Sequence, residues 1–400
     1  MQIDAEDQLA RRAHESAAIA EIAPLLDAFG GEVYLVGGTV RDLILGREFV
    51  DVDLAVDGDP ADLATAIGTP ESSETRFGTI SVWRAGCRYD LARTRRERYP
   101  RPGALPEVEP GGIEDDLTRR DFTVNALALA LGGAPAGGLG GAPAGALLSA
   151  PGALEDLQAR ELAVLHDRSF SDDPTRLLRL ARYAARLGFA VAPHTRELAS
   201  EAVASNALDT ISGTRIGNEL RLLAAEPDPV AAFRATQGLG LPWGIDGEAA
   251  RQALAVLPPD GRADLLVLAL VLAEVESDGI DAMGFTAAER KAILEGREAR
   301  AVARGLAGAN SNSEIARIVG ASGIETVALA FSQGAASPSL TWLQDLRHLR
   351  LQIGGDDLID KGIPEGPRLG YALQAARDAL MDGEATDRES QLRVALEAAE

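Results

Sequence analysis

Two aspartates separated by one residue, Asp51 and Asp53, have a spacing that could support metal chemistry. They fall within residues 49–56, where apolar and polar side chains alternate as they do in a strand. Residues i and i+2 of a strand point to the same face, with Cα atoms roughly 6.6 Å apart. Because hard divalent cations prefer oxygen ligands, the pair is a candidate catalytic and metal-binding site. The alternative is an exposed strand face.

A pair of glycines, Gly37-Gly38, lies upstream of the aspartates, between a β-branched and aromatic run at 32–36 and a helically spaced run at 39–45. Glycine lets backbone amides approach a phosphate, and a helix N-terminus favours an anion. Arg41 could add a charge-assisted contact. Taken alone, the glycines could simply form a tight turn. Together with the carboxylates they predict a site that binds metal and phosphate side by side.

A second polar cluster interrupts an apolar segment, residues 116–128. Its members are Arg119, Arg120, Asp121 and Asn125. Guanidinium and amide groups are the donors that a triphosphate or a ribose requires. The alternative is the start of a helix with an ordinary salt bridge.

A third segment has Asp173, Arg176 and Arg179 at intervals of three residues, which places them on one face of a helix capped by Ser171 or Asp172. A carboxylate can accept from an exocyclic amine, and a guanidinium can donate to a ring nitrogen or a carbonyl oxygen. Such a pair could read cytosine or adenine and reject uracil and guanine. The alternative is a surface salt bridge.

The elements around these residues divide the chain into two parts. Strand-like runs at 78–84 and 87–94 are joined by an Ala-Gly turn, and 95–112 is predicted to be a loop rich in Arg, Pro and Gly. Residues 132–151 form an Ala/Gly/Pro tract that predicts a surface loop. From about residue 153 the periodicity is helical almost throughout.

Length and charge limit the possible functions. Four hundred residues predict two or more domains, and the net charge of −22 argues against a general nucleic-acid coat. A local basic groove on an acidic body is still compatible with that charge. One cysteine and the lack of a long apolar run lead us to expect a protein of the reducing cytoplasm with no membrane partner.

In this order, the three segments resemble the class II tRNA nucleotidyltransferase and bacterial poly(A) polymerase family. The resemblance covers roughly residues 30–225, and the run Arg-Arg-Asp-Phe-Thr-Val-Asn-Ala at 119–126 is its most specific part. It implies an α+β protein whose polymerase-β-like nucleotidyltransferase head, with a mixed β-sheet, occupies 1–150. An all-helical neck with the base-reading motif (151–228) and a helical, tRNA-binding body and tail (229–400) would follow.

The resemblance also implies nucleotidyl transfer by two metal ions from CTP or ATP to the 3′ end of a tRNA. Asp51 and Asp53 would hold Mg²⁺, and Asp90 would either be a third carboxylate or only brace the site. Asp173 and Arg176 would act as the protein template for the incoming base, with Arg179 and Arg182 nearby. The remaining nucleotide contacts would come from Gly37, Gly38, Arg41, Asp42, Arg119, Arg120, Asp121 and Asn125.

Arg95, Arg96 and Arg98 could meet the phosphates of the acceptor stem, or could form a solvated edge balanced by Glu97 and Glu107. In the family the base-reading motif begins Glu-Asp, whereas this chain has Asp172-Asp173. The sequence leaves open addition of CCA, of CC only, of A only or of poly(A), and a non-catalytic nucleotide- or RNA-binding protein. It gives no oligomeric state. With four histidines and no His cluster, a metal phosphohydrolase is not expected.

Overall fold

The computed structural model describes residues 9, 11–13, 15–29, 31–49, 51–70, 78–132 and 143–400. The chain divides into two compact units, Met1–Ile211 and Ser212–Glu400. This boundary falls inside the segment expected to form the neck. The finer division into head, neck, body and tail stays a prediction.

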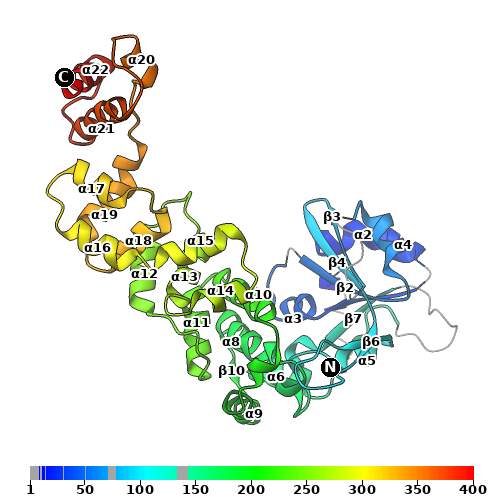
Figure 1. Cartoon of the computed structure of the whole chain (residues 1–400). Coiled ribbons are helices and arrows are strands. Elements are labelled where there is room, and N and C mark those ends of the chain that lie inside the picture. The colour runs from blue at the N-terminus through cyan, green and yellow to red at the C-terminus, as the bar shows by residue number, and fades with distance from the viewer. Residues whose placement is uncertain are drawn as a thin grey trace. The chain divides into compact units, whose positions relative to one another are not determined.

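The first unit is built on one mixed six-stranded sheet (Figure 1). Across the sheet the strands are β3 (Thr79–Arg84), β4 (Cys87–Arg93), β2 (Asp51–Asp57), β1 (Glu32–Val36), β7 (Leu127–Gly132) and β8 (Leu147–Ser149). Only β2 and β4 pair in parallel; the other neighbours are antiparallel. The mixed sheet confirms the predicted α+β head.

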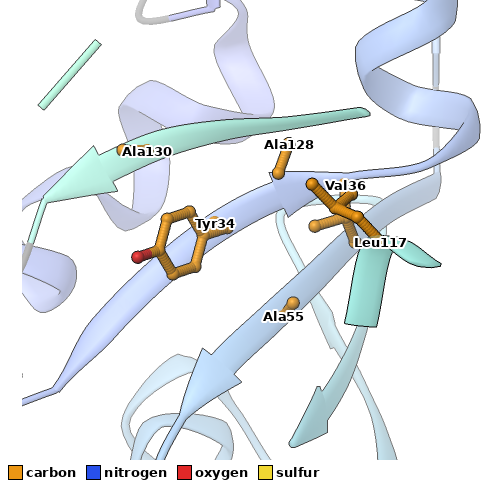
Figure 2. Packing of buried hydrophobic residues seen from close by; sticks show 6 residues of the cluster. All are labelled: Tyr34, Val36, Ala55, Leu117, Ala128 and Ala130. Atoms are coloured by element: carbon orange, nitrogen blue, oxygen red, sulfur yellow. The ribbon is translucent and has the colours of Figure 1, made fainter. Parts of the chain in front are cut away.

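One face of the sheet carries both Asp51 and Asp53. Ala55 follows them at the same two-residue interval and packs in a buried cluster with Val36, Leu117 and Ala128, which Figure 2 shows together with Tyr34 and Ala130. Leu117 belongs to α5 (Ile113–Thr118), so this short helix packs against the face that carries the aspartates.

The opposite face of the sheet packs against α2 (Ala17–Ala28) and α4 (Pro60–Ile67). The alternate side chains of β2, Val52 and Leu54, are buried there, as the alternation predicted. The buried Tyr89 hydroxyl of β4 donates to the Ala18 carbonyl of α2 over 2.7 Å. Because one face of β2 is fully apolar, its register is fixed and the aspartates are held on the other face.

The prediction of a loop at 95–112 is wrong in part. Arg95–Arg98 (β5) and Glu107–Pro110 (β6) form an antiparallel hairpin. The register places Arg96 opposite Glu109 and Arg98 opposite Glu107. Arg96 pairs with Asp115 of α5, so packing against that helix overrides the poor strand propensity of the sequence.

One further expectation for the first unit needs correction, and one strand was not foreseen. Residues 127–132, which the sequence analysis left unassigned, form strand β7 after a short 3₁₀ turn at Thr123–Asn125. The tract 132–151, expected to be a surface loop, contains strand β8, which pairs with β7. Residues 133–142 of that tract lie outside the described residues.

Beyond the sheet the first unit is largely helical, with α6 (Ala153–Ala159), α7 (Ser169–Asp172), α8 (Thr175–Leu187) and α9 (Pro193–Ala204). A two-residue parallel pair, β9 (Glu161–Leu162) with β10 (Ala190–Val191), interrupts the neck that was expected to be all-helical.

The second unit, residues 212–400, is described throughout and contains helices without strands, as predicted. Its α-helices are α10 (Gly213–Ala224), α11 (Pro229–Gly238), α12 (Gly247–Val256), α13 (Ala263–Val271), α14 (Ser277–Ala282), α15 (Ala287–Gly296), α16 (Ala299–Ala307), α17 (Asn312–Val319), α18 (Ile324–Ser332), α19 (Ala336–Gln344), α20 (Gly355–Ile359), α21 (Pro367–Met381) and α22 (Arg388–Ala399). Over the described residues no single helix is long and apolar enough to cross a membrane. Only α17 and α18 taken together have the length and composition of a membrane span, and they are bent by 115° at the break between them.

Candidate active site

The structure brings three carboxylates onto adjacent strands. Asp53 on β2 lies directly opposite Asp90 on β4 in the parallel register, and Asp51 is two residues before Asp53 on the same face. Asp51 is exposed, whereas Asp53 and Asp90 are half-buried. The alternation therefore predicted correctly that Asp51 and Asp53 share one face of a strand, and their binding of a metal stays a prediction.

Asp53 has an unusual protonation equilibrium. Burial, helped by the nearby Asp90 and Asp51, raises its pKa to about 6 against the opposing effect of Arg120 and Arg41. Ionising the Asp53 carboxyl therefore costs free energy, because the group is buried beside two other carboxylates. A bound cation would lower that cost.

The donor set fits a hard divalent cation held by two carboxylates. Asp90 is already engaged, since it accepts from the Ser81 hydroxyl at 2.5 Å and pairs with Arg88 at 3.1 Å. Among the described residues no group of three His, Cys, Asp or Glu side chains is arranged to hold a metal by itself. Mg²⁺ is commonly bound by one or two carboxylates together with substrate phosphates and water, so Asp51 and Asp53 would be sufficient as its protein ligands.

The glycine pair turns the chain from β1 into α3 (Gly38–Ile44). Gly37 has a φ of 65°, which favours glycine, and a Cβ there would come within 2.6 Å of Arg120 Nη1. The following Thr39, which the sequence did not single out, accepts from the backbone N–H of Asp53 at 3.2 Å. The turn is therefore fastened to the strand that carries the aspartates.

Arg41 and Asn125, both predicted to contact nucleotide, are buried and contact each other. Arg41 donates through Nη1 to Asn125 Oδ1 at 2.5 Å, and through Nε and Nη2 to the Asp42 carboxylate at 3.0 and 2.9 Å. Asn125 in turn donates to Asp121 at 3.0 Å. The side chains of Arg41 and Asn125 therefore orient the first turn of α3, and they are not exposed in a cleft.

Asp121 continues this network toward the third predicted segment. Arg179 of α8 donates to its carboxylate through Nε at 2.8 Å and forms an ion pair through Nη2 at 2.7 Å. Burial alone would raise the pKa of Asp121, but Arg179 and the hydrogen bond from Asn125 hold it at about 2. The structure therefore joins residues of the three predicted segments in one chain of contacts.

Arg119 and Arg120 share a buried partner that the sequence reading missed. Asp116 accepts from Arg119 at 2.5 Å and from Arg120 at 2.8 Å. Burial would raise the pKa of Asp116, but the charges of Arg120 and Arg119 outweigh it and lower the pKa. Arg119 also donates to Glu97 Oε1 at 3.1 Å. An acidic residue three or four positions before each arginine was the available signal.

Asp173 and Arg176, the residues predicted to read the base, lie at a helix start whose cap differs from the one predicted. α8 begins at Thr175, and its first turn is held by the Asp173 carboxylate, which accepts from the Thr175 N–H at 3.0 Å and its hydroxyl at 2.6 Å. Arg176 is buried and donates to Ser169 Oγ at 2.7 Å and to the Arg119 carbonyl at 2.8 Å. The cap predicted at Ser171 or Asp172 is wrong, because those residues belong to α7.

Tyr183 is the aromatic residue that sequence reasoning missed. The guanidinium carbons of Arg182, Arg179 and Arg41 lie 5.1, 5.6 and 5.7 Å from its ring centre. Such contacts fix long, charged side chains at modest energetic gain. Its position seven residues after Arg176 carries no separate signal in the sequence.

The arginines predicted to contact RNA lie on β5 and are partly paired within the molecule. Arg95 contacts Glu97 at 2.8 Å, and Arg96 forms a two-pronged pair with Asp115 at 3.0 and 3.1 Å. Arg98 is exposed, and no ion pair joins it to another residue within the described ranges. The alternative that Glu97 neutralises these arginines is therefore realised for Arg95.

Comparison with known proteins extends the likeness to nearly the whole chain. Residues 33–162 match the poly A polymerase head domain family. An A-adding tRNA nucleotidyltransferase of Geobacter sulfurreducens is 33% identical over 92% of this chain and 45% of its own. A CCA-adding enzyme of Lactobacillus johnsonii is 28% identical over 90% of this chain and 92% of its own. A solved structure of a CCA-adding enzyme in an apo form has a TM-score of 0.79 at 26% identity, covering 98% of both chains.

The chain spans about half or less of the length of the first curated relatives it matches. The matching head domain, the three motifs in one network and the likeness of the whole fold nevertheless agree. Residues 33–162 carry a head domain of the poly A polymerase family, and nearly the whole chain is similar to A-adding and CCA-adding tRNA nucleotidyltransferases.

Proposed function

We propose that this protein adds C, A or both to the 3′ end of a tRNA, taking nucleotidyl groups from CTP and ATP with Mg²⁺. The observation that carries the proposal is the placement of Asp51, Asp53 and Asp90 on adjacent strands, with the pKa of Asp53 raised to about 6. A structural carboxylate is normally paired or solvated, whereas this one is held where a cation would neutralise it.

The chain's own residues supply binding and orientation around that centre. Nucleotidyltransferases of this family depend on a divalent metal, which would be held by Asp51 and Asp53 and would neutralise the reacting phosphate and activate the RNA 3′-hydroxyl. Arg120 and Arg41 add positive charge beside Asp53. Because Arg41 is fixed by Asp42 and Asn125, it contributes a positioned charge with little loss of side-chain entropy.

Base selection is assigned to Asp173 and Arg176. One Asp173 oxygen is used to cap α8, and Arg176 is held by Ser169 and the Arg119 carbonyl. Side chains fixed in this way present a donor and acceptor pattern that does not adapt to each base. A rigid pattern matched to an exocyclic amine disfavours uracil and guanine because their carbonyls would leave the buried groups unpaired.

Two versions of the activity have support from different relatives. The Lactobacillus johnsonii relative, 92% of whose length is matched by this chain, is named a CCA-adding enzyme. This match favours complete CCA addition. The relative at 33% identity is named an A-adding enzyme, which favours addition of the terminal A only. CC-only addition and poly(A) synthesis use the same chemistry at the same carboxylates.

The test is incorporation by the purified protein on three tRNAs that end before CCA, after C and after CC. Each is offered CTP, ATP, UTP or GTP with Mg²⁺, and products are sized at single-nucleotide resolution. We expect CCA to be completed on the shortest tRNA. Extension only after CC would identify an A-adding enzyme, arrest at CC a CC-adding enzyme, and long A tails a poly(A) polymerase. No incorporation on any RNA would overturn the proposal and favour a non-catalytic RNA- or nucleotide-binding protein.

A further inference from the structure

Thr39 joins the turn after β1 to the strand that carries the aspartates through its side-chain hydroxyl. Thr39 belongs to the first turn of α3 and is buried, with 3% of its surface exposed. Its Oγ1 accepts from the backbone N–H of Asp53 at 3.2 Å and donates to the Asp51 carbonyl over a longer 3.4 Å. One hydroxyl therefore bonds a donor and an acceptor of β2 at the same time.

Both backbone groups face the edge of β2 on which β1 lies. Successive residues of a strand turn their N–H and C=O groups to opposite edges. The Val56 carbonyl faces β4, because it accepts at 2.9 Å from the N–H of Thr94, the residue that follows β4. Asp51 and Asp53 lie an odd number of residues before Val56, so their N–H and C=O groups face β1 on the other side.

The paired part of β1 ends just before this segment of β2. Among the described residues, the register of β1 with β2 ends with Leu35 opposite Leu54, and the chain then turns into α3. β4 continues along the other edge and pairs with both Asp51 and Asp53. The segment with the two carboxylates is therefore held on one edge by a strand and on the other edge by the Thr39 hydroxyl.

The backbone of this segment determines where the carboxylates point. Each carboxylate is attached to its Cα through a single methylene group, so a twist or shift of the backbone moves the oxygens with it. Residues that orient metal ligands without touching the ion change its affinity when they are lost. A hydrogen-bond partner of the Asp51 and Asp53 backbone therefore belongs among the groups that determine metal affinity.

We propose that Thr39 is a positioning residue of the metal centre, whose hydroxyl takes the place of a further β1 residue and keeps Asp51 and Asp53 at the spacing that binds a divalent cation. It acts through the backbone of the two ligands and does not itself hold the ion. Serine would retain the hydroxyl, whereas valine has the shape of threonine without it. This inference rests on the proposed function for the presence of a metal ion at Asp51 and Asp53.

The first measurement is binding of Mn²⁺ alone, followed by the electron paramagnetic resonance signal of the free ion, without RNA or nucleoside triphosphate. Mn²⁺ prefers the same oxygen ligands as Mg²⁺. We expect Thr39→Val to raise the dissociation constant of the ion about 10-fold, the size of effect that residues behind metal ligands produce. Thr39→Ser keeps the donor and the acceptor and should bind Mn²⁺ like the wild type.

Hydrogen exchange measured by mass spectrometry in EDTA tests the hydrogen bond itself. The peptide that contains residues 51–54 should lose protection at the Asp53 amide in Thr39→Val and retain it in Thr39→Ser.

Thr94→Val is the matched control. Thr94 is also buried, and its hydroxyl donates at 3.4 Å to a β2 carbonyl, that of Val56. This variant loses a comparable bond at the other end of the strand and should bind Mn²⁺ like the wild type. Urea unfolding shows whether the two valine variants are folded and similarly destabilised.

Kinetics provide a readout that general destabilisation would not change. In incorporation assays on a tRNA with CTP and ATP, Thr39→Val should raise the Mg²⁺ concentration for half-maximal rate by the same factor as the Mn²⁺ dissociation constant. The KM for the tRNA should stay at the wild-type value, because the lost hydroxyl is buried.

Several results would overturn the inference. Wild-type Mn²⁺ binding in Thr39→Val, with or without faster amide exchange, would make the hydroxyl a structural contact only. An equal loss in Thr94→Val, or no recovery in Thr39→Ser, would attribute the effect to general loosening of the sheet. A wild type that binds no Mn²⁺ would remove both the metal site and its positioning residue. If the wild type adds no nucleotide to any RNA while Thr39→Val still weakens Mn²⁺ binding, the proposed function fails and the positioning role stands.

Discussion

Arg41 and Asn125 are 84 residues apart in the chain, yet the guanidinium of one donates to the side-chain oxygen of the other over 2.5 Å in the interior of the first unit. Asn125 donates through its own amide to Asp121, and Asp121 accepts from Arg179 of α8. Asn125 therefore connects the turn after β1 with the carboxylate that binds α8. The turn proposed to bind phosphate and the helix proposed to read the base are thus parts of one polar network.

Replacement of Asn125 by alanine should therefore damage both stability and activity. Arg41 Nη1 and Asp121 would each lose a buried partner, at a cost of about 1–3 kcal/mol in the free energy of unfolding. Urea unfolding measures this loss, and Asn218→Ala, at an exposed position on α10, is the matched control. An Asn125→Ala protein as stable as the control would contradict the network.

Removal of the Asp51 carboxylate should abolish catalysis without harming the fold. Asp51 is exposed at the start of β2, so Asp51→Ala leaves the core intact. The loss of metal-assisted charge neutralisation, several kcal/mol, should reduce the incorporation rate about 10³-fold or more. Incorporation is measured by single turnover, with Asp62→Ala on α4, also an exposed aspartate, as control. Near-normal rates in Asp51→Ala would remove this residue from the metal site.

Asp53 should make the stability of the metal-free protein depend on pH. Its pKa is about 6 in the folded state and 3.8 ordinarily, so the folded protein holds this proton more tightly than the unfolded chain. The stability that the protonated group contributes is fully present below about pH 4 and is lost as the pH rises through about 6. In EDTA at pH 7.5, Asp53→Asn should be about 1–3 kcal/mol more stable than the wild type, and the difference should vanish near pH 4.

Urea unfolding across this pH range measures the effect of Asp53. Adding Mg²⁺ at pH 7.5 should stabilise the wild type and leave Asp53→Asn unchanged, since only the wild type gains a partner for the ionised carboxylate. A gap between the two proteins that is the same at pH 4 and pH 7.5 would refute the raised pKa.

Arg176→Lys should change which base is accepted more than it changes binding of the RNA. Lysine keeps the charge but loses the planar fork that now contacts Ser169 and the Arg119 carbonyl. The ratio of kcat/KM for CTP or ATP to that for UTP or GTP should fall about 10-fold, which is roughly one hydrogen bond of discrimination. Parallel assays of the four nucleotides on one tRNA give this ratio. Unaltered selectivity with reduced stability would make Arg176 a structural residue only.

Local patterns were sufficient to predict the strand that carries the aspartates and the turn that precedes it. The two-residue alternation from Asp51 onward is a property of one segment, and Val52 and Leu54 are indeed buried on the opposite face. The run at 127–132 could not be assigned from the sequence because a short apolar segment buried on both faces has no period that separates strand from helix. Its pairing with β1 and β8 decided the outcome.

The partners of the predicted arginines could not be read from the sequence. Whether Arg119 faces a ligand or Asp116 and Glu97 depends on how α5 and the β5 hairpin pack, and Glu97 is 22 residues away. The same is true of Tyr183, whose ring is surrounded by arginines from α3 and α8. The residue types predicted a site rich in guanidinium donors, and long-range packing determined which of these donors bond to carboxylates of the protein itself.

The pairing of β1 with β7 has a consequence for how the protein is made. These neighbouring strands are separated by nearly a hundred residues, so the sheet cannot be completed until the ribosome has released Gly132. Until then Arg41 lacks Asn125, and the nascent chain carries an unpaired strand edge and unmatched buried charges. Contacts of such sequence separation slow folding and lengthen exposure to aggregation. We therefore expect nascent chains that stop between β4 and β7 to be the most dependent on chaperones.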